Sequence, residues 1–116
     1  MPSDPDAGFL ADIVNNIALA RAFVGQLSLE QFEADPKSVY AVTRCLEIIS
    51  EASRRLSDDV KARHSHLDWK EMAGAGNVYR HGYQIVRADI LWRTVHDFLP
   101  PLLTVVEREL KRPRTG

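Results

Sequence analysis

The stretch from Gly76 to Tyr83 brings together an amide, an imidazole and a phenol, three groups that can serve in catalysis or binding. Asn77 and His81 stand four residues apart, so in a helix they project from the same face. Gly82 is typical of a helix C-terminus, because glycine adopts the left-handed backbone geometry that ends helices. The sequence therefore predicts a small polar cluster at a helix end, with Tyr83 just beyond the histidine.

His81 is the member of this cluster best suited to acid–base chemistry, because histidine titrates near neutral pH. Asparagine and arginine bind phosphate or stabilise its developing charge. RNA cleavage needs these groups: a base for the attacking 2′-hydroxyl, an acid for the leaving oxygen and a cation for the transition state. A twofold dimer that places His81 of both subunits in one cleft would supply base and acid together. The alternative is a hydrogen-bonded structural histidine.

The chain as a whole has the pattern of a single helical domain. Its 116 residues suffice for one core. Apolar residues recur at steps of three and four, without strand-like alternation. We predict an all-α fold in residues 1–110, followed by a basic, disordered tail in residues 111–116.

Capping signals mark several helices in the first two thirds of the chain. One helix is predicted over roughly residues 5–25, and Ser28 with Gln31 has the form of a capping box for a short helix after it. Ser57, followed by two aspartates, predicts the start of another short helix that ends near residues 63–66.

The dipeptide Asp35-Pro36 predicts the start of a long amphipathic helix, because it joins a capping acid to the imino acid favoured at the first helical position. Its apolar seam is expected to hold Val39, Val42, Leu46, Ile49, Ser53 and Leu56. Ile48 lies off this seam, which indicates a second apolar contact such as a neighbouring subunit. On the polar sides, Glu51 and Arg55 are spaced for an ion pair.

Two further helices are predicted in the last third of the chain. Asp68 and Glu71 form a capping box for a helix whose core stripe is Trp69, Met72, Ala75 and Tyr79. The final helix begins near Asp89, and its apolar side is expected to hold Leu91, Val95, Phe98, Leu102, Val106 and Leu110. Pro100 and Pro101 should kink or restart it, because a proline inside a helix costs ~3 kcal/mol or more.

Composition argues against several classes of protein. A net charge of -1 disfavours a protein that coats nucleic acid by charge, and no helix has the basic face of a DNA-binding domain. Residues 1–73 hold 8 Lys and Arg against 12 Asp and Glu, whereas residues 74–116 hold 7 against 4. No apolar run approaches the ~20 residues of a membrane span, and the acidic N-terminus lacks a signal-peptide pattern, so we expect a cytoplasmic protein.

The candidate metal ligands are few. Cys45 is the only cysteine, which excludes an internal disulfide and a cysteine-built zinc site. His64, His66 and Asp68 could be imagined as ligands, but residues two apart in a loop with no further partner are a weak pattern. We therefore predict no metal site and no cofactor.

Several separated segments together resemble the HepT-like proteins of the HEPN superfamily. The similarity follows the family order over nearly the whole chain. The segments that carry it are residues 46–52 with 55–56, 69–74, 77–83, 91–92 and 99–103.

This resemblance implies an antiparallel bundle of four to five helices that forms a homodimer. It implies the ribonuclease toxin of a type VII toxin–antitoxin system, a metal-independent endoribonuclease that cleaves RNA at a dimer cleft. The partner would be a nucleotidyltransferase of the MntA type. In the family motif, an arginine and a polar residue precede a histidine, which is followed by any residue and a tyrosine. These positions imply Asn77 and His81 as catalytic residues and Tyr83 as the acceptor of adenylyl groups, which would block RNA with bulk and negative charge.

One position departs from the family motif. Gly76 stands where the family has its arginine, and no other arginine lies four to six residues before His81. The guanidinium that would bind phosphate is absent, so activity is expected to be reduced or lost. Arg80 and Arg87 are nearby cations that could contact phosphate instead.

A second hypothesis follows from this departure. The chain could be a catalytically inactive helical dimer that binds a nucleotidyltransferase and serves as its adenylylation substrate. This hypothesis predicts that replacing His81 leaves partner binding intact, whereas the nuclease hypothesis predicts that a restored arginine gives RNA cleavage.

Overall fold

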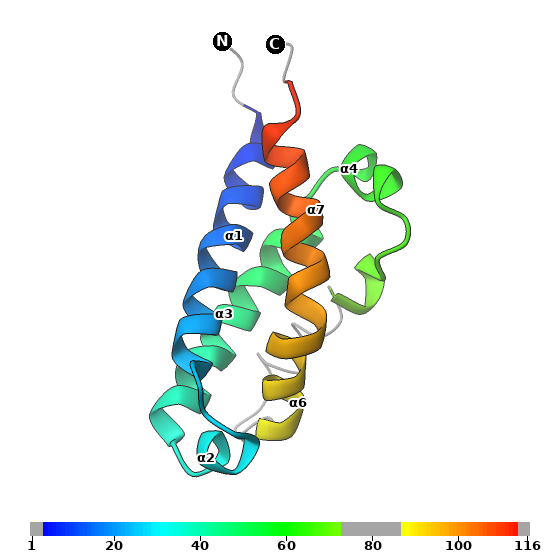
Figure 1. Ribbon diagram of the computed structural model, residues 1–116. Helices are drawn as coiled ribbons and strands as arrows, with labels where there is room; N and C mark the ends of the chain where they lie inside the picture. The colour runs from blue at the N-terminus through cyan, green and yellow to red at the C-terminus, as the bar shows by residue number, and fades with distance from the viewer. Residues whose placement is uncertain (1–3, 73–86, 114–116) are drawn as a thin grey trace.

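Two long antiparallel helices, joined by a short one, form one side of the molecule (Figure 1). They are α1 (Pro5–Val24) and α3 (Pro36–Arg55), and the link between them contains α2 (Leu29–Glu33). The computed structural model describes residues 4–72 and 87–113. In that part of the chain every regular element is helical, which confirms the predicted all-α fold.

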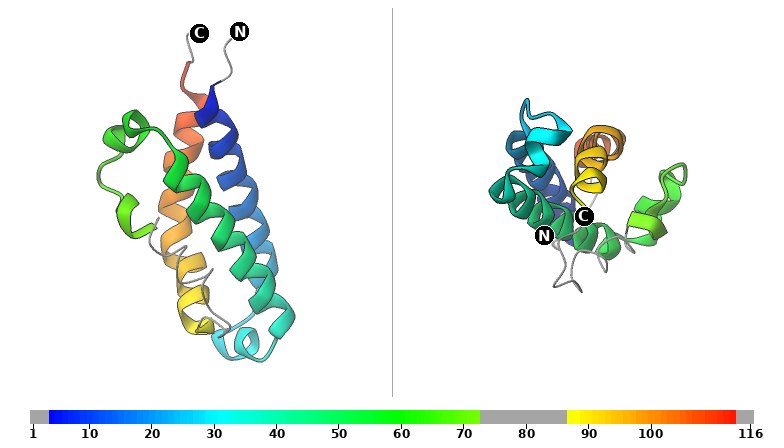
Figure 2. Two further views of the ribbon diagram at one scale, coloured as in Figure 1. Left: turned by 180° about the vertical axis from the view of Figure 1, so that it is seen from behind. Right: turned by 90° about the horizontal axis from the view of Figure 1, so that it is seen from below.

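The remaining described elements are α4 (Asp58–Arg63) and a C-terminal helical rod. The rod consists of α6 (Ala88–Arg93), the π-helical turn η1 (Thr94–Phe98) and α7 (Leu99–Lys111). α7 packs beside α1, and the two helices run in opposite directions (Figures 1 and 2). α4 and residues 64–72 stand to one side of α1, α3 and the C-terminal rod, as the end-on view shows (Figure 2).

α1 begins and ends as its sequence predicts. The Asp4 side chain accepts a hydrogen bond from the Asp6 N–H at 2.9 Å, and Pro5 occupies the first turn, where its missing N–H costs little. At the other end Gly25 takes φ 51° and donates its N–H to the Arg21 carbonyl. The buried residues of the helix are Leu10, Ile13, Asn16, Ile17, Ala20 and Val24.

α1 is more apolar than expected, because no run in the sequence was predicted to approach a membrane span. By length and composition alone it would suffice to cross a membrane, with a mean hydropathy of 1.3 over 18 residues. One face of the helix nevertheless lies in the core against α3 and α7. An apolar helix that packs inside a bundle passes the same test, so we interpret α1 as a core helix.

The predicted capping box of α2 is present. The Ser28 N–H donates to Gln31 Oε1 at 2.9 Å, and the Gln31 N–H donates to Ser28 Oγ at 3.2 Å. The predicted cap of α3 is wrong in one respect, because Asp35 makes no side-chain hydrogen bond to the helix backbone. Its carboxylate accepts instead from the Ser38 hydroxyl at 2.6 Å, a local side-chain donor that competes with the backbone amides.

The polar face of α3 carries the predicted pair of Glu51 with Arg55 and two further ion pairs, Glu51 with Arg54 and Glu47 with Arg44. Glu51 accepts hydrogen bonds from Arg54 and Arg55, and the guanidinium of Arg54, followed by that of Arg55, lowers the pKa of Glu51 to about 2. Ile48, expected to make a second apolar contact, is half-buried and lines a groove between α1 and α3 beside Phe9. The subunit contact predicted for Ile48 remains a prediction.

The C-terminal rod restarts at its prolines, as predicted. In η1 the Leu99 N–H reaches the Thr94 carbonyl, five residues back, and α7 then begins with Pro100 in its first turn. At the other end of α7, Leu110 is 37% exposed, whereas Glu109 is buried. From Leu102 the predicted stripe advances four residues at a time, and each such step turns by about 40° around the helix axis. Leu110 therefore lies ~80° around the helix from Leu102, whereas Glu109, seven residues after Leu102, lies only ~20° from it.

Asp68 caps the helix that follows α4, by accepting the Glu71 N–H at 2.9 Å. Trp69 donates its indole N–H to the His64 carbonyl at 3.0 Å, and Met72 is buried in the core. The rest of the predicted stripe, Ala75 and Tyr79, lies outside the described residues. The predicted tail boundary at residue 110 stays a prediction, although α7 continues through Lys111.

Candidate functional site

The predicted catalytic cluster falls on the part of the chain that the structure does not describe. The residues concerned are Gly76, Asn77, Arg80, His81 and Tyr83. Their predicted roles therefore rest on the sequence. The described residues that flank this segment are Met72 on one side and Arg87 on the other.

Arg87 is engaged by a neighbouring carboxylate. Its Nη2 lies 2.7 Å from Asp89 Oδ2, and its Nε donates to Asp89 Oδ1 at 3.1 Å. The hydrogen bond from Arg87 lowers the pKa of Asp89, which holds the pair in its ionised form. Because the Arg87 side chain is 75% exposed, this pair stays open to solvent, and a phosphate would have to compete with Asp89 for the guanidinium.

A small pocket is lined by residues on both sides of the undescribed segment, including Met72 and Ile90. Its volume is about 170 Å³, and residues from α3, from the helix start before Met72 and from α6 and η1 enclose it. The lining residues are Leu46, Ile49, Ser50, Glu71, Met72, Ile90, Thr94, Phe98 and Leu99. Its volume is below the ~300 Å³ that ligand pockets usually exceed, so we interpret it as a gap in the packing of these helices.

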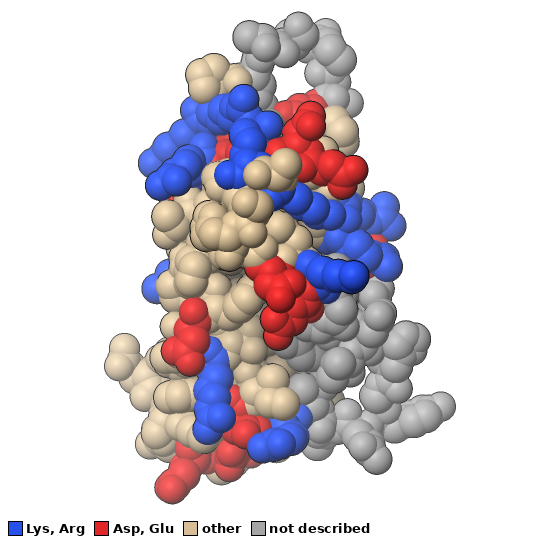
Figure 3. Space-filling view, turned by 90° about the vertical axis from the view of Figure 1, so that its right-hand side faces the viewer, with Lys and Arg blue, Asp and Glu red and all other residues tan. Residues whose placement is uncertain are grey.

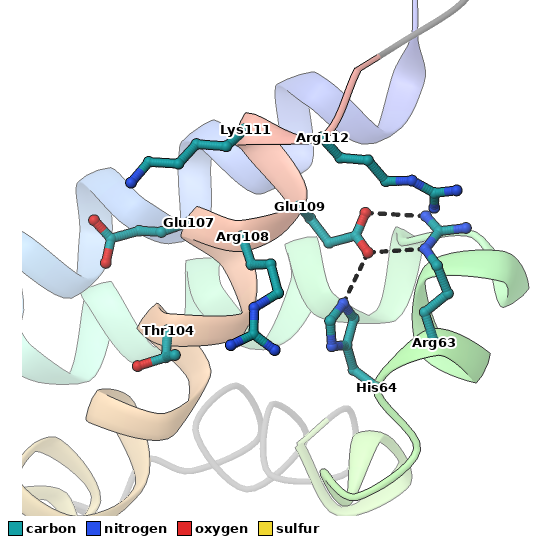
Figure 4. A pocket seen from close by; sticks show the side chains of 8 residues that line it. All are labelled: Arg63, His64, Thr104, Glu107, Arg108, Glu109, Lys111 and Arg112. Carbon is teal, nitrogen blue, oxygen red and sulfur yellow. Dashed lines mark hydrogen bonds and ion pairs between the residues drawn. The ribbon is translucent and has the colours of Figure 1, made fainter.

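The structure reveals a charged cluster that was not predicted from the sequence, formed by Arg63, His64 and Glu109 (Figure 4). Arg63 Nε and Nη2 donate to the two carboxylate oxygens of Glu109 at 2.9 and 3.0 Å. His64 Nε2 lies 2.8 Å from Glu109 Oε1. The Glu109 side chain is only 3% exposed, and hydrogen bonding from Arg63, helped by His64 and opposed by burial, lowers its pKa to about 2.

One sequence signal could have revealed this cluster. Glu109 continues the apolar stripe of the last helix, seven residues after Leu102, where a leucine or valine would be expected. A buried carboxylate on such a stripe requires a partner, because an unpaired charge is costly to bury. The partner itself, Arg63, is 46 residues away and has no local signature.

The three metal ligands that were considered, His64, His66 and Asp68, do not form a group that could hold a metal ion. His64 bonds Glu109, and Asp68 caps a helix. The rings of His64 and His66 meet edge to face, with centroids 6.2 Å apart. Among residues 4–72 and 87–113, no group of three potential ligands has a geometry that could hold a metal ion.

A basic hollow of about 790 Å³ opens beside this cluster, between α4 and α7 (Figure 4). Its lining residues are Arg63, His64, Thr104, Glu107, Arg108, Glu109, Lys111 and Arg112. Four of these are cationic and two are acidic. Basic side chains gather at this end of the molecule in the space-filling view (Figure 3).

Comparison with known proteins identifies the chain's relatives. The family model described as "Ribonuclease HepT-like" matches residues 13–109. A protein of Thermococcus cleftensis named "Probable ribonuclease HepT" is 38% identical, over 81% of this chain and 86% of its own length. A protein of Methanocaldococcus jannaschii named as a "Putative RNase" is 33% identical, over 85% of this chain and 91% of its own length. No solved structure matches the chain.

Proposed function

The chain belongs to the HepT-like ribonuclease family, and on that premise we propose that it is the ribonuclease toxin of a toxin–antitoxin pair. The observation that carries the proposal is a family match over residues 13–109, which includes the whole predicted cluster. The RNase names of the relatives support RNA as the substrate. We place the protein in the cytoplasm with an MntA-type nucleotidyltransferase as its antitoxin.

In the proposed reaction, His81 residues from the two subunits of a homodimer act at one cleft. One imidazole removes the proton of a 2′-hydroxyl, which attacks the adjacent phosphorus, and the other protonates the departing 5′-oxygen. Asn77 binds the phosphate or anchors the histidine. No metal is needed for these steps. Gly76 leaves the cleft without the guanidinium of the family motif, so the rate is reduced or lost.

The decisive experiment restores the missing cation. RNA cleavage and growth inhibition are measured for the present chain, for Gly76→Arg, and for Gly76→Arg combined with His81→Ala. The single variant should gain activity, and the double variant should lose that gain because the proton carrier is gone. Equal cleavage by all three proteins would remove the ribonuclease proposal.

A second candidate function is favoured by Gly76 and by the pairing of Arg87 with Asp89. Both observations reduce the number of cations that are free to bind phosphate. In this alternative the chain is an inactive helical dimer that binds a nucleotidyltransferase and accepts adenylyl groups on Tyr83. Incubation with the nucleotidyltransferase and ATP, followed by mass spectrometry, tests it. An adduct on another residue with none on Tyr83 would exclude this switch.

A further inference from the structure

The residues that line the basic hollow carry more positive than negative charge. Glu109 is occupied by Arg63 and His64, which leaves Arg108, Lys111 and Arg112 to face a single acid, Glu107. All three of these cations are exposed, and no ion pair of theirs occurs among residues 4–72 and 87–113. The hollow is therefore a net positive surface, although the chain as a whole has a charge of -1.

The three cations also share one region of a rigid element. Arg108 lies in the last turn of α7, three residues before Lys111 and four before the C-cap Arg112, so it can neighbour each of them along the helix. The Lys111 and Arg112 side chains extend to opposite sides of Arg108 (Figure 4). The buried Glu109 fixes Arg63 across the opening by two parallel hydrogen bonds, which ties α4 to the wall formed by α7. The hollow is thus held in shape before any ligand arrives.

We propose that this hollow is a secondary binding site for the phosphodiester backbone of RNA. Lysine and arginine at such spacing contact successive phosphates and release counterions, a mode of binding that does not depend on base sequence. The inference rests on the proposed function for the identity of the polymer. The predicted chemistry depends on residues 76–83, and the inference adds a binding surface outside them.

The position of the hollow indicates what it contributes. The rod from α6 to α7 runs from Ala88, just after the predicted cluster in the chain, to the hollow at the other end of the molecule (Figure 1). At ~1.5 Å per residue, the twenty residues from Ala88 to Arg108 cover roughly 30 Å. The hollow therefore holds RNA at a distance from the start of α6 at Ala88, and it strengthens binding of longer RNAs.

The test is an RNA-binding measurement that does not depend on cleavage. Binding of a labelled single-stranded RNA of about 20 nucleotides, longer than the ~4–16 that one small domain covers, is followed by fluorescence anisotropy on a His81→Ala background. The hollow variant is Arg108→Gln with Lys111→Gln. The control is Arg21→Gln with Lys37→Gln, which removes two exposed cations that lie outside the hollow.

The hollow variant should weaken binding about tenfold at low salt, and the slope of log K against log[salt] should fall by about 1.4, or ~0.7 for each lost contact. The control should change binding by less than about twofold, since it alters only the overall field. Circular dichroism and thermal unfolding establish that both variants are folded.

Three outcomes would overturn the inference. If the hollow and control variants weakened RNA binding equally, net charge alone would explain the effect. If neither variant changed RNA binding, the hollow would not be a binding site. If the hollow variant kept RNA binding but lost binding to the nucleotidyltransferase, the surface would belong to a protein partner. This test measures binding and not cleavage. A loss of RNA binding in the hollow variant would therefore support the site even if the Gly76→Arg variant failed to cleave RNA.

Discussion

Glu109 and Arg63 lie 46 residues apart in the chain and meet through two parallel hydrogen bonds of 2.9 and 3.0 Å. The pair joins the last helix to α4, which stands beside the three long helices (Figure 1). His64 adds a third contact to the same carboxylate, so Glu109 holds both residues at the end of α4.

Replacing Glu109 should destabilise the fold. In Glu109→Ala the buried His64 loses its partner and Arg63 turns to solvent, so we expect a loss of roughly 2–3 kcal/mol in the free energy of unfolding. For a domain of this size that corresponds to a melting temperature lower by about 10 °C. Urea titration and thermal unfolding measure both quantities. The neighbouring exposed Glu107→Ala should stay within ~0.5 kcal/mol of the parent, and a similar loss in both variants would contradict the assignment.

The same carboxylate should make stability depend on pH. The folded-state pKa of Glu109 is about 2, below its ordinary value of 4.5, so its contribution is complete above pH 4.5 and is lost as pH falls through 2. The difference in unfolding free energy between the parent and Glu109→Gln should therefore shrink as pH drops from about 5 to 2. Denaturant titrations at several pH values test this, and a difference that grew on acidification would show the wrong sign.

Asp6 is expected to contribute a second link to the start of α4. Its Oδ1 accepts the Ser57 N–H at 2.8 Å, and its Oδ2 accepts the Ser57 hydroxyl at 2.6 Å. Asp6→Ala should lower the free energy of unfolding by about 1–2 kcal/mol, since two hydrogen bonds to a carboxylate are lost. Chemical denaturation provides the measurement. Asp12→Ala, an exposed change on the same helix, serves as the control, and equal effects would argue against the Asp6–Ser57 link.

Two glycines of the first helical segment should respond in opposite ways to alanine. Gly25 has φ 51°, and an added Cβ would lie 3.4 Å from the Ala22 carbonyl oxygen, so Gly25→Ala should destabilise by about 1–3 kcal/mol. Gly8 lies inside α1 with open space around it, and Gly8→Ala should stabilise by about 0.5–1 kcal/mol. Melting temperatures that shifted in the same direction for both variants would contradict the backbone conformations assigned to these two glycines.

The all-α class and most of the local capping could be predicted from the sequence, although the Asp35 cap was predicted wrongly. The bonds between Ser28 and Gln31, from the Val60 N–H to Ser57 Oγ, and from the Glu71 N–H to Asp68 Oδ1 each span three residues. Such bonds form within one turn of chain, so residue type and spacing are enough to predict them. The family resemblance is likewise a property of residue order, and the family comparison confirms the family, whereas the role of His81 stays a prediction.

The Glu109 cluster and the hollow were decided by tertiary structure. Glu109 could be recognised as a charge on an apolar stripe, but only the packing of α7 beside the end of α4 determines that Arg63 and His64 meet it. Local spacing determines where a helix begins and which faces are apolar, whereas contacts between distant segments depend on how those faces rotate and pack together.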